Sequence, residues 1–255
     1  MKLDFTGGTD TGLVRSSNQD AYCVDPEGRF FIVADGMGGH AGGQEASAIA
    51  TKTVQDYLEK HWSSHHASPW LLEQAIFEAN RAILRDQDQH LERSDMGTTI
   101  VVLIFRPSPQ GDSTEAEPWC AHVGDSRLYR LRGSRLEQLT EDHTWVNRAV
   151  RQGTITLEQC RTHPWRHVLS QCLGRRDLEQ VDVRQLDILP GDRLLLCSDG
   201  LTEEVPDDLI SQNLKKTRAS DIVVKNLINL AKERGGRDNV TIVAVIADMN
   251  QPTTP

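Results

Sequence analysis

The chain has 255 residues, enough for one domain with a sizeable core, and it carries a net charge of −9. This acidic balance argues against nucleic acid or an anionic membrane as the main partner, since both select basic surfaces. No apolar run reaches bilayer length, and the N-terminus lacks a signal-peptide pattern. The five cysteines form no CxxC pair, which is typical of reduced thiols, so we expect a cytoplasmic protein. We also expect it to be a monomer.

Apolar periodicity predicts short strands and a smaller number of amphipathic helices. In chain order, we predict strands over 3–9, 21–24 and 29–34, helices over 44–61 and 70–91, strands over 98–105, 119–123, 127–132 and 135–139, a helix over 145–152, strands over 181–186 and 193–197, helices over 207–214 and 220–233, and a strand over 240–247. Because the helices come in pairs and do not follow each strand, an α+β fold with antiparallel sheets is favoured. Residues 106–118 read as a surface loop, and residues 250–255 as a disordered tail.

Four acidic motifs lie at predicted strand ends. Asp35, Asp125 and Asp199 each follow an apolar run, whereas Asp238 stands before one. If the strand over 240–247 runs antiparallel to the strand over 193–197, Asp199 and Asp238 reach the same sheet edge. Several carboxylates at one edge repel each other unless cations neutralise them, so the sequence predicts a metal site.

The donors at these strand ends are oxygens, without histidine or cysteine at zinc-like spacing. Oxygen ligands favour Mg²⁺ or Mn²⁺ over zinc. Gly36, directly after Asp35, exposes its backbone carbonyl to a metal because it has no side chain. Asp–Gly pairs are also ordinary turn residues, so the joint pattern is much more specific than any single pair.

Two further motifs surround these aspartates. RSSNQD, residues 15–20, places Arg15 and Asp20 before a strand, and a guanidinium can hold two phosphate oxygens bidentately. Alone, this motif reads as a polar turn. GMGGHAGG, residues 36–43, lacks the Gly-Lys-Ser/Thr of a P-loop. We interpret it as a tight loop that lets Asp35 and Gly36 approach a metal.

Taken in order, the motifs RSSNQD, FFIVADGMGGHAGG, MGTT, VGDSRLYRL, LLLCSDGLTE and GGRDNVTIV resemble those of metal-dependent PPM-type protein phosphatases, also called protein phosphatase 2C. The resemblance covers residues 3–248 and is greatest to short, single-domain bacterial members. It implies a four-layer α-β-β-α sandwich, with two antiparallel sheets flanked by helix pairs. It also implies one catalytic domain over residues 1–249, with a flap subdomain at about 141–174.

The resemblance further implies a ligand set for two Mg²⁺ or Mn²⁺ ions. Asp35 would bridge the two ions, Asp199 and Asp238 would complete the first, and the Gly36 carbonyl would bind the second. A third, weaker ion is bound in many bacterial relatives, and Asp125, shared with Asp199, matches its ligand.

Other positions match the family less completely. By the resemblance, Asp20 would act through a metal-bound water and Arg15 would hold the substrate phosphate. Many eukaryotic members have a histidine after Asp–Gly as proposed general acid, but this chain has Met37, as bacterial relatives do. His40 is the nearest candidate for that role. The acidic residue that often precedes Asp20 is replaced here by Gln19.

The implied activity is hydrolysis of phosphoserine and phosphothreonine in proteins by direct attack of a water that bridges the metals. Expected substrates in signal transduction are the targets of a Ser/Thr kinase, or a small phosphorylated signalling protein. The main alternative is a pseudophosphatase that only binds phosphoproteins. Against it, Asp35, Asp199 and Asp238 are all present.

A cysteine phosphatase is a rival enzyme class, because Cys-x5-Arg spacing occurs at Cys23–Arg29 and at Cys160–Arg166. Acidic residues and a proline follow Cys23, and a proline follows Cys160, which disfavours a phosphate-binding loop at either place. The flap segment itself is rich in arginine. It reads either as a solvated helical face or as a surface that recognises phosphopeptides, and its arginines are Arg148, Arg151, Arg161 and Arg166.

Overall fold

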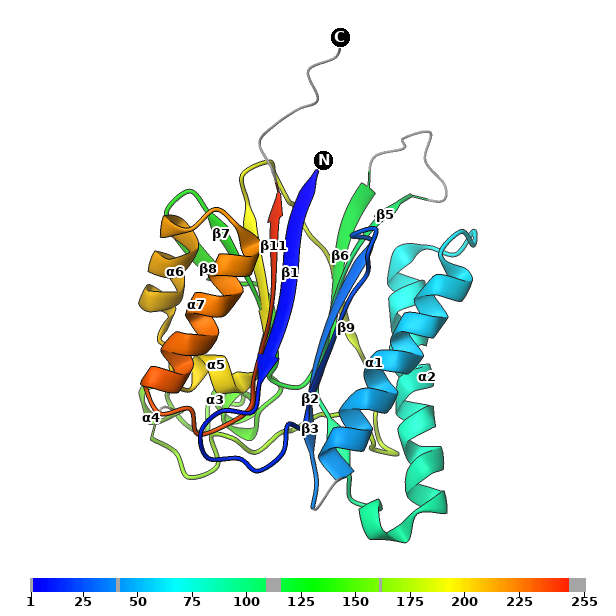
Figure 1. Cartoon of the computed structure of the whole chain (residues 1–255). Coiled ribbons are helices and arrows are strands. Elements are labelled where there is room, and N and C mark those ends of the chain that lie inside the picture. The colour runs from blue at the N-terminus through cyan, green and yellow to red at the C-terminus, as the bar shows by residue number, and fades with distance from the viewer. Residues whose placement is uncertain (1, 40–41, 109–115, 161, 248–255) are drawn as a thin grey trace.

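The computed structural model describes residues 2–39, 42–108, 116–160 and 162–247. Two antiparallel sheets face each other, and helices cover the outer face of each (Figure 1). The predicted four-layer α-β-β-α sandwich is therefore confirmed. Within the described ranges, no helix is both long and apolar enough to cross a bilayer.

The first sheet joins the two ends of the chain. Its order is β1 (Leu3–Asp10), β11 (Val240–Ala247), β10 (Arg193–Cys197), β7 (Arg127–Arg132) and β8 (Arg135–Gln138). Each neighbouring pair is antiparallel. The first and last strands of the described chain therefore lie side by side.

The second sheet is built from the first half of the chain and one later strand. Its order is β2 (Asp20–Val24), β3 (Phe30–Met37), β5 (Ile100–Pro107), β6 (Ala116–Val123) and β9 (Asp182–Gln185), with β4 (Gly97–Thr98) paired to β3. The strand predicted over 98–105 is thus split into β4 and β5. Thr99 separates them, and its backbone N–H donates to the carbonyl oxygen of Asp35 at 2.8 Å.

Helices cover the two outer faces. The second sheet is covered by α1 (Gly42–His61) and α2 (Ser68–Gln89), which is followed by the short 3₁₀ helix η1 (Leu91–Arg93). The first sheet is covered by α5 (Asp199–Thr202), α6 (Asp207–Lys216) and α7 (Ser220–Glu233). The remaining helices, α3 (Trp145–Arg151) and α4 (Leu157–Cys160), belong to the segment between β8 and β9. The short helices η1, α4 and α5 were not predicted.

Three apolar layers hold the four structural layers together. In β3, Phe30 and Ile32 pack with the helices, while Phe31 and Val33 pack between the sheets. Successive side chains of a strand point to opposite faces, so a strand covered on both faces is apolar throughout. A third cluster lies between the first sheet and its helices. This burial on both sides explains the continuous apolar runs that precede Asp35 and Asp199.

The strand predicted over 29–34 ends later than expected. It continues to Met37 because Gly36 and Met37 pair with Thr98 and Gly97 of β4. Asp35 and Gly36 therefore belong to the strand and are held by its hydrogen bonds, not by a turn. Conversely, Asp199 begins the short helix α5 directly after β10. The remaining predicted elements begin and end within a few residues of the observed ones.

Candidate active site

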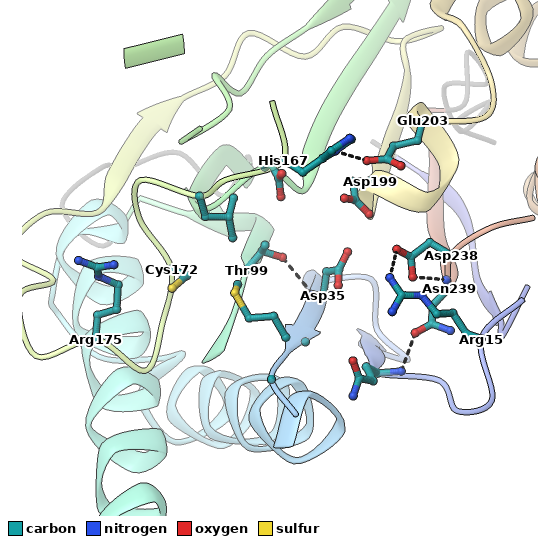
Figure 2. Close-up of a pocket in the computed structure, with 16 residues that line it drawn as sticks. Arg15, Asp35, Thr99, His167, Cys172, Arg175, Asp199, Glu203, Asp238 and Asn239 are labelled. Carbon is teal, nitrogen blue, oxygen red and sulfur yellow. Dashed lines mark hydrogen bonds and ion pairs between the residues drawn. The ribbon is translucent and has the colours of Figure 1, made fainter. Parts of the chain in front are cut away.

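Four aspartates from both sheets line one cavity at the edge of the sandwich where β3 and β10 end (Figure 2). The cavity has a volume of about 580 Å³. Asp35 lies in β3, Asp125 lies between β6 and β7, Asp199 begins α5, and Asp238 precedes β11. Strands β10 and β11 are antiparallel, so Asp199 and Asp238 reach the same edge, as the sequence predicts.

Asp20 lies behind these aspartates and is not among the residues that line the cavity. It pairs directly with Asp35 across β2 and β3, and its side chain is buried. The hydroxyl of Ser198 donates to Asp20 Oδ2 at 2.8 Å. The other oxygen, Oδ1, is buried and has no hydrogen-bond partner among the described residues. Such an unpartnered buried oxygen is costly unless it meets a cation or a water.

The carboxylates of Asp20, Asp35, Asp125 and Asp199 are crowded, and the pKa of each is raised. Burial, together with the charges of Asp20 and Asp199, raises the pKa of Asp35 well above its usual range. Burial and the charge of Asp199 do the same to the pKa of Asp125. Burial also raises the pKa of Asp20 and of Asp199 to about 6. A divalent cation would relieve this repulsion, and carboxylate oxygens suit Mg²⁺ or Mn²⁺, so these residues fit a hard metal ion.

Gly36 lies where the backbone is too crowded for a side chain. A Cβ atom at this position would lie 1.9 Å from the carbonyl oxygen of Gly43 and 2.5 Å from that of Gln19. The Gly36 N–H donates to the Gln19 carbonyl at 3.1 Å, and the Asp35 N–H donates to Thr99 Oγ1 at 3.0 Å. The start of α1 thus packs on the end of β3, and Gly36 lies at the cavity wall.

Arg15 lies on the cavity wall, next to the aspartates. Its Nη2 atom donates to Asp238 Oδ2 at 2.7 Å, and its side chain is 52% exposed. Asn239, which the sequence analysis did not single out, fixes the loop that carries Arg15. Its side-chain amide donates to the carbonyls of Thr11 and Ser17, both at 3.0 Å. The structure therefore places the predicted phosphate-binding residue beside the predicted metal ligands.

Two other residues of the cavity were missed by sequence reasoning. His167, from the flap segment, contacts Glu203, with Nδ1 and Oε1 2.5 Å apart (Figure 2). Each of His167, Glu203 and Asp199 has one atom that could ligate a metal, and these three atoms lie within 4.8 Å of one another. His167 and Glu203 are far apart in sequence and neither lies in an apolar pattern, so no local signal could have paired them.

The flap segment contributes to the cavity through one short stretch. Besides His167, the side chains of Leu169 and Cys172 line its wall. The predicted flap arginines Arg148, Arg151 and Arg166 are not among the lining residues, and Arg151 pairs with Glu141. His40, the predicted general-acid candidate, and Arg161 lie outside the described residues.

The structure argues against the cysteine-phosphatase reading. Burial raises the pKa of the Cys23 thiol to about 11, opposite to what a thiolate nucleophile needs. Arg29 is held by two hydrogen bonds to Asp25, at 2.9 and 2.6 Å, and not by a loop around Cys23. Cys160 lies in α4, and its thiol contacts the carbonyl of Val146 at 3.8 Å. Neither cysteine lines the acidic cavity.

A sequence model of the protein phosphatase 2C family matches residues 11–241. The serine/threonine phosphatase stp of Listeria monocytogenes serotype 4b is 34% identical over 249 residues, which cover 95% of each chain. These matches span the cavity residues from Arg15 to Asp238.

Solved structures agree with this match. The serine/threonine phosphatase of S. agalactiae superposes with a TM-score of 0.85 at 32% identity, covering 97% of this chain and 100% of that one. The catalytic domain of the serine/threonine protein phosphatase PstP, in complex with two manganese ions, gives a TM-score of 0.80 at 31% identity, covering 96% and 98%. Because the family match spans most of the chain and the carboxylate cavity suits divalent cations, the chain belongs to the protein phosphatase 2C family and is a metal-dependent serine/threonine protein phosphatase.

Proposed function

We propose that the acidic cavity holds two Mg²⁺ or Mn²⁺ ions and is the place where phosphoserine and phosphothreonine side chains are hydrolysed. Asp35 would be the ligand shared by the two ions, Asp199 and Asp238 would help to hold one, and the Gly36 carbonyl would help to hold the other, since all four residues line the cavity. The observation that carries this proposal is the carboxylate cluster itself, because burial and mutual repulsion raise the pKa of Asp35, Asp125 and Asp199. When bound, a pair of divalent cations supplies Lewis-acid charge and an activated water for attack on phosphorus.

The surrounding residues orient the substrate and the metal ligands. Arg15 moves from Asp238 to the phosphoryl oxygens of the substrate, which its planar guanidinium can hold bidentately. Asp20 accepts from the Ser198 hydroxyl through Oδ2. Its Oδ1 is buried without a hydrogen-bond partner among the described residues, and it would accept from a water held by a metal ion. His40 remains the proposed source of the leaving-group proton, on sequence grounds alone.

A third, weaker ion belongs to the same proposal. Asp125 and Asp199 line the cavity together, and the charge of Asp199 raises the pKa of Asp125. His167 and Glu203 extend this group of donors toward the flap. We propose that a third Mg²⁺ or Mn²⁺ is held here by Asp125 and Asp199.

The proposed substrates are proteins phosphorylated on serine or threonine, either targets of a Ser/Thr kinase or a small phosphorylated signalling protein. The net charge of −9 makes nucleic acid and anionic membranes poor partners. All five cysteines are free, as suits an enzyme in the reducing cytoplasm of a bacterium, and we propose that it acts as a monomer. The flap, at about residues 141–174, completes the catalytic domain and contacts the substrate beside the cavity.

The proposal is tested with purified protein, Mn²⁺, a generic aryl phosphate, a phosphothreonine peptide and a phosphotyrosine peptide. We expect Mn²⁺-dependent hydrolysis of the first two, with the phosphotyrosine peptide cleaved more slowly. Residues behind a metal ligand typically affect activity 10–100-fold, so Asp35→Asn should lower the rate by more than about 100-fold. An Asp35→Asn protein that melts like the wild type and keeps its activity would refute the metal mechanism and leave a different site to be found.

A further inference from the structure

His143 connects the flap to the loop that carries Asp125. Its backbone N–H donates to the carbonyl of Gly124 at 2.9 Å, and the Gly124 N–H donates to His143 Nδ1 at 3.1 Å. One residue therefore holds both backbone polar groups of Gly124, which immediately precedes Asp125. The side chain of His143 is 11% exposed, so these bonds are partly shielded from water.

The same residue also holds the returning end of the flap. The N–H of Ser170 donates to the His143 carbonyl at 2.8 Å, and the N–H of Trp145 donates to the carbonyl of Val168 at 2.7 Å. Thr144 and Leu169 form an antiparallel bridge between these two bonds. Both ends of the flap therefore meet at His143, next to the stretch that brings His167 to the cavity.

The hydrogen-bond partners of the His143 ring determine which ring nitrogen carries the proton. Because Nδ1 accepts from Gly124, the proton of a neutral His143 ring is on Nε2, which donates to Asp182 Oδ2 at 3.1 Å. Asp182 belongs to β9, the edge strand of the second sheet. The ring also stacks on that of His122 in β6, with centroids 4.6 Å apart and planes 21° apart. The ring is thereby fixed on both edges and on one face.

The grouping of His122, His143 and Asp182 also has the spacing of a metal site, with one donor atom from each within 4.8 Å of the others. Proton positions disfavour that interpretation. A metal on Nε2 of His143 requires a proton on Nδ1, and that proton would face the N–H of Gly124. His122 donates from Nε2 to the carbonyl of Glu141 at 2.9 Å, so only its Nδ1 would be open to a metal. Each of these contacts pairs a hydrogen-bond donor with an acceptor, so none of them requires a metal ion.

We propose that His143 is a positioning residue, which fixes the flap and the Asp125 loop relative to each other through Gly124 and Asp182. Movement of the flap is then transmitted to the carboxylate of Asp125, and movement of Asp125 to the flap. Only the consequence for activity rests on the proposed function of the cavity. The link itself is read from hydrogen exchange and proteolysis, which do not require a phosphatase reaction.

Two substitutions test separately the hydrogen bonds made by the two ring nitrogens of His143. Asn places an amide oxygen near the position of Nδ1, so His143→Asn keeps an acceptor for Gly124 and loses the reach to Asp182. Gln places its amide near the position of Nε2, so His143→Gln keeps a donor for Asp182 and leaves the Gly124 N–H without its partner. His163→Gln is the matched control, because His163 lies in the flap and stacks on Trp145 without touching Gly124.

Hydrogen exchange of the Gly124 amide is measured by NMR on ¹⁵N-glycine-labelled protein with Mg²⁺ bound, because paramagnetic Mn²⁺ would broaden the signal of an amide so close to the cavity. We expect exchange in His143→Gln to be faster by about ten-fold or more, since losing one hydrogen bond of about 1.4 kcal/mol shifts an equilibrium ten-fold. Exchange in His143→Asn and His163→Gln should stay within about three-fold of wild type. Asp182→Ala removes the acceptor for Nε2 of His143 and so loosens the flap. Trypsin should therefore cleave this variant faster after Arg148 and Arg151 of the flap.

Activity is the second readout. Removing a residue behind a metal ligand typically costs 10–100-fold, so we expect kcat/KM for a phosphothreonine peptide to fall at least ten-fold in His143→Gln and much less in His143→Asn. Equal effects of Asn and Gln on Gly124 exchange would overturn the proposal, as would unchanged cleavage of the flap in Asp182→Ala. Stoichiometric binding of Zn²⁺ that is lost in Asp182→Ala would also overturn it, in favour of a metal site. If His143→Gln does not fold, the cleavage rate of Asp182→Ala decides alone.

Discussion

The guanidinium of Arg15 lies at the cavity wall, pairs with Asp238 and has half of its side chain in solvent. A substrate phosphate offers it two oxygens in one plane, which Lys cannot match with its single ammonium group. We therefore predict that Arg15→Lys raises KM for an aryl phosphate about ten-fold, the loss expected for one charge-assisted hydrogen bond. Initial rates at saturating Mn²⁺ measure this change.

The control is Arg81→Lys on α2, where the arginine pairs with Glu78 on the surface and does not line the cavity. Its KM should equal that of the wild type. If Arg15→Lys instead lowers kcat with KM unchanged, Arg15 acts mainly in the transition state and not in substrate binding. If neither parameter changes, Arg15 is only the partner of Asp238.

At the scale of elements, the junction of β3 with α1 tolerates no side chain at Gly36. A Cβ atom there would overlap the backbone oxygens of Gly43 and Gln19, and backbone cannot move aside as a flexible side chain can. We predict that Gly36→Ala lowers the free energy of unfolding by about 3 kcal/mol, at the upper end of overpacking costs. Gly39→Ala, just after β3, meets no atom of the described residues within 4 Å and should be close to neutral. Denaturant unfolding of both variants checks this, and equal stabilities would contradict it.

Elements with continuous apolar sequence were predictable because they are buried on both faces, as β3 and β10 are. The convergence of Asp199 and Asp238 was also predictable, since it needs only the antiparallel pairing of β10 with β11. The extension of β3 to Met37 was not, because it depends on pairing with β4, about 60 residues later. The contact of His167 with Glu203 likewise depends on how the flap folds back, which leaves no periodic pattern in the sequence.

At the scale of the whole molecule, the carboxylates come from both sheets. Asp20 and Asp35 belong to the second sheet, whereas Asp199 and Asp238 adjoin strands of the first. The bond from Ser198 to Asp20 crosses between the sheets at 2.8 Å. Cations bound among these residues would tie the two sheets together, so we expect the stability of the sandwich to depend on metal occupancy.

The stability of the metal-free protein is also expected to change with pH. Burial raises the pKa of Asp20 and of Asp199 to about 6 in the folded chain, from an ordinary value of 3.8. A carboxyl with a raised folded-state pKa destabilises the fold when it is ionised. This penalty is absent below about pH 4, grows as the pH rises and is complete above about pH 6, where one such group costs about 3 kcal/mol.

We therefore predict that metal-free protein is less stable at pH 7.5 than at pH 5, by several degrees in melting temperature, and that Mn²⁺ stabilises it more at pH 7.5 than at pH 5. Thermal unfolding with chelator and with Mn²⁺ at both values measures this. Asp20→Asn keeps an oxygen that accepts from Ser198 but carries no charge, so the metal-free variant should lose part of the pH dependence. The wild type and Asp20→Asn differ by a single charge, so general effects of net charge on stability are nearly the same in both. A difference between their pH profiles therefore reports the local repulsion around Asp20. Identical pH profiles for the wild type and Asp20→Asn would mean that the charge of Asp20 does not destabilise the metal-free fold.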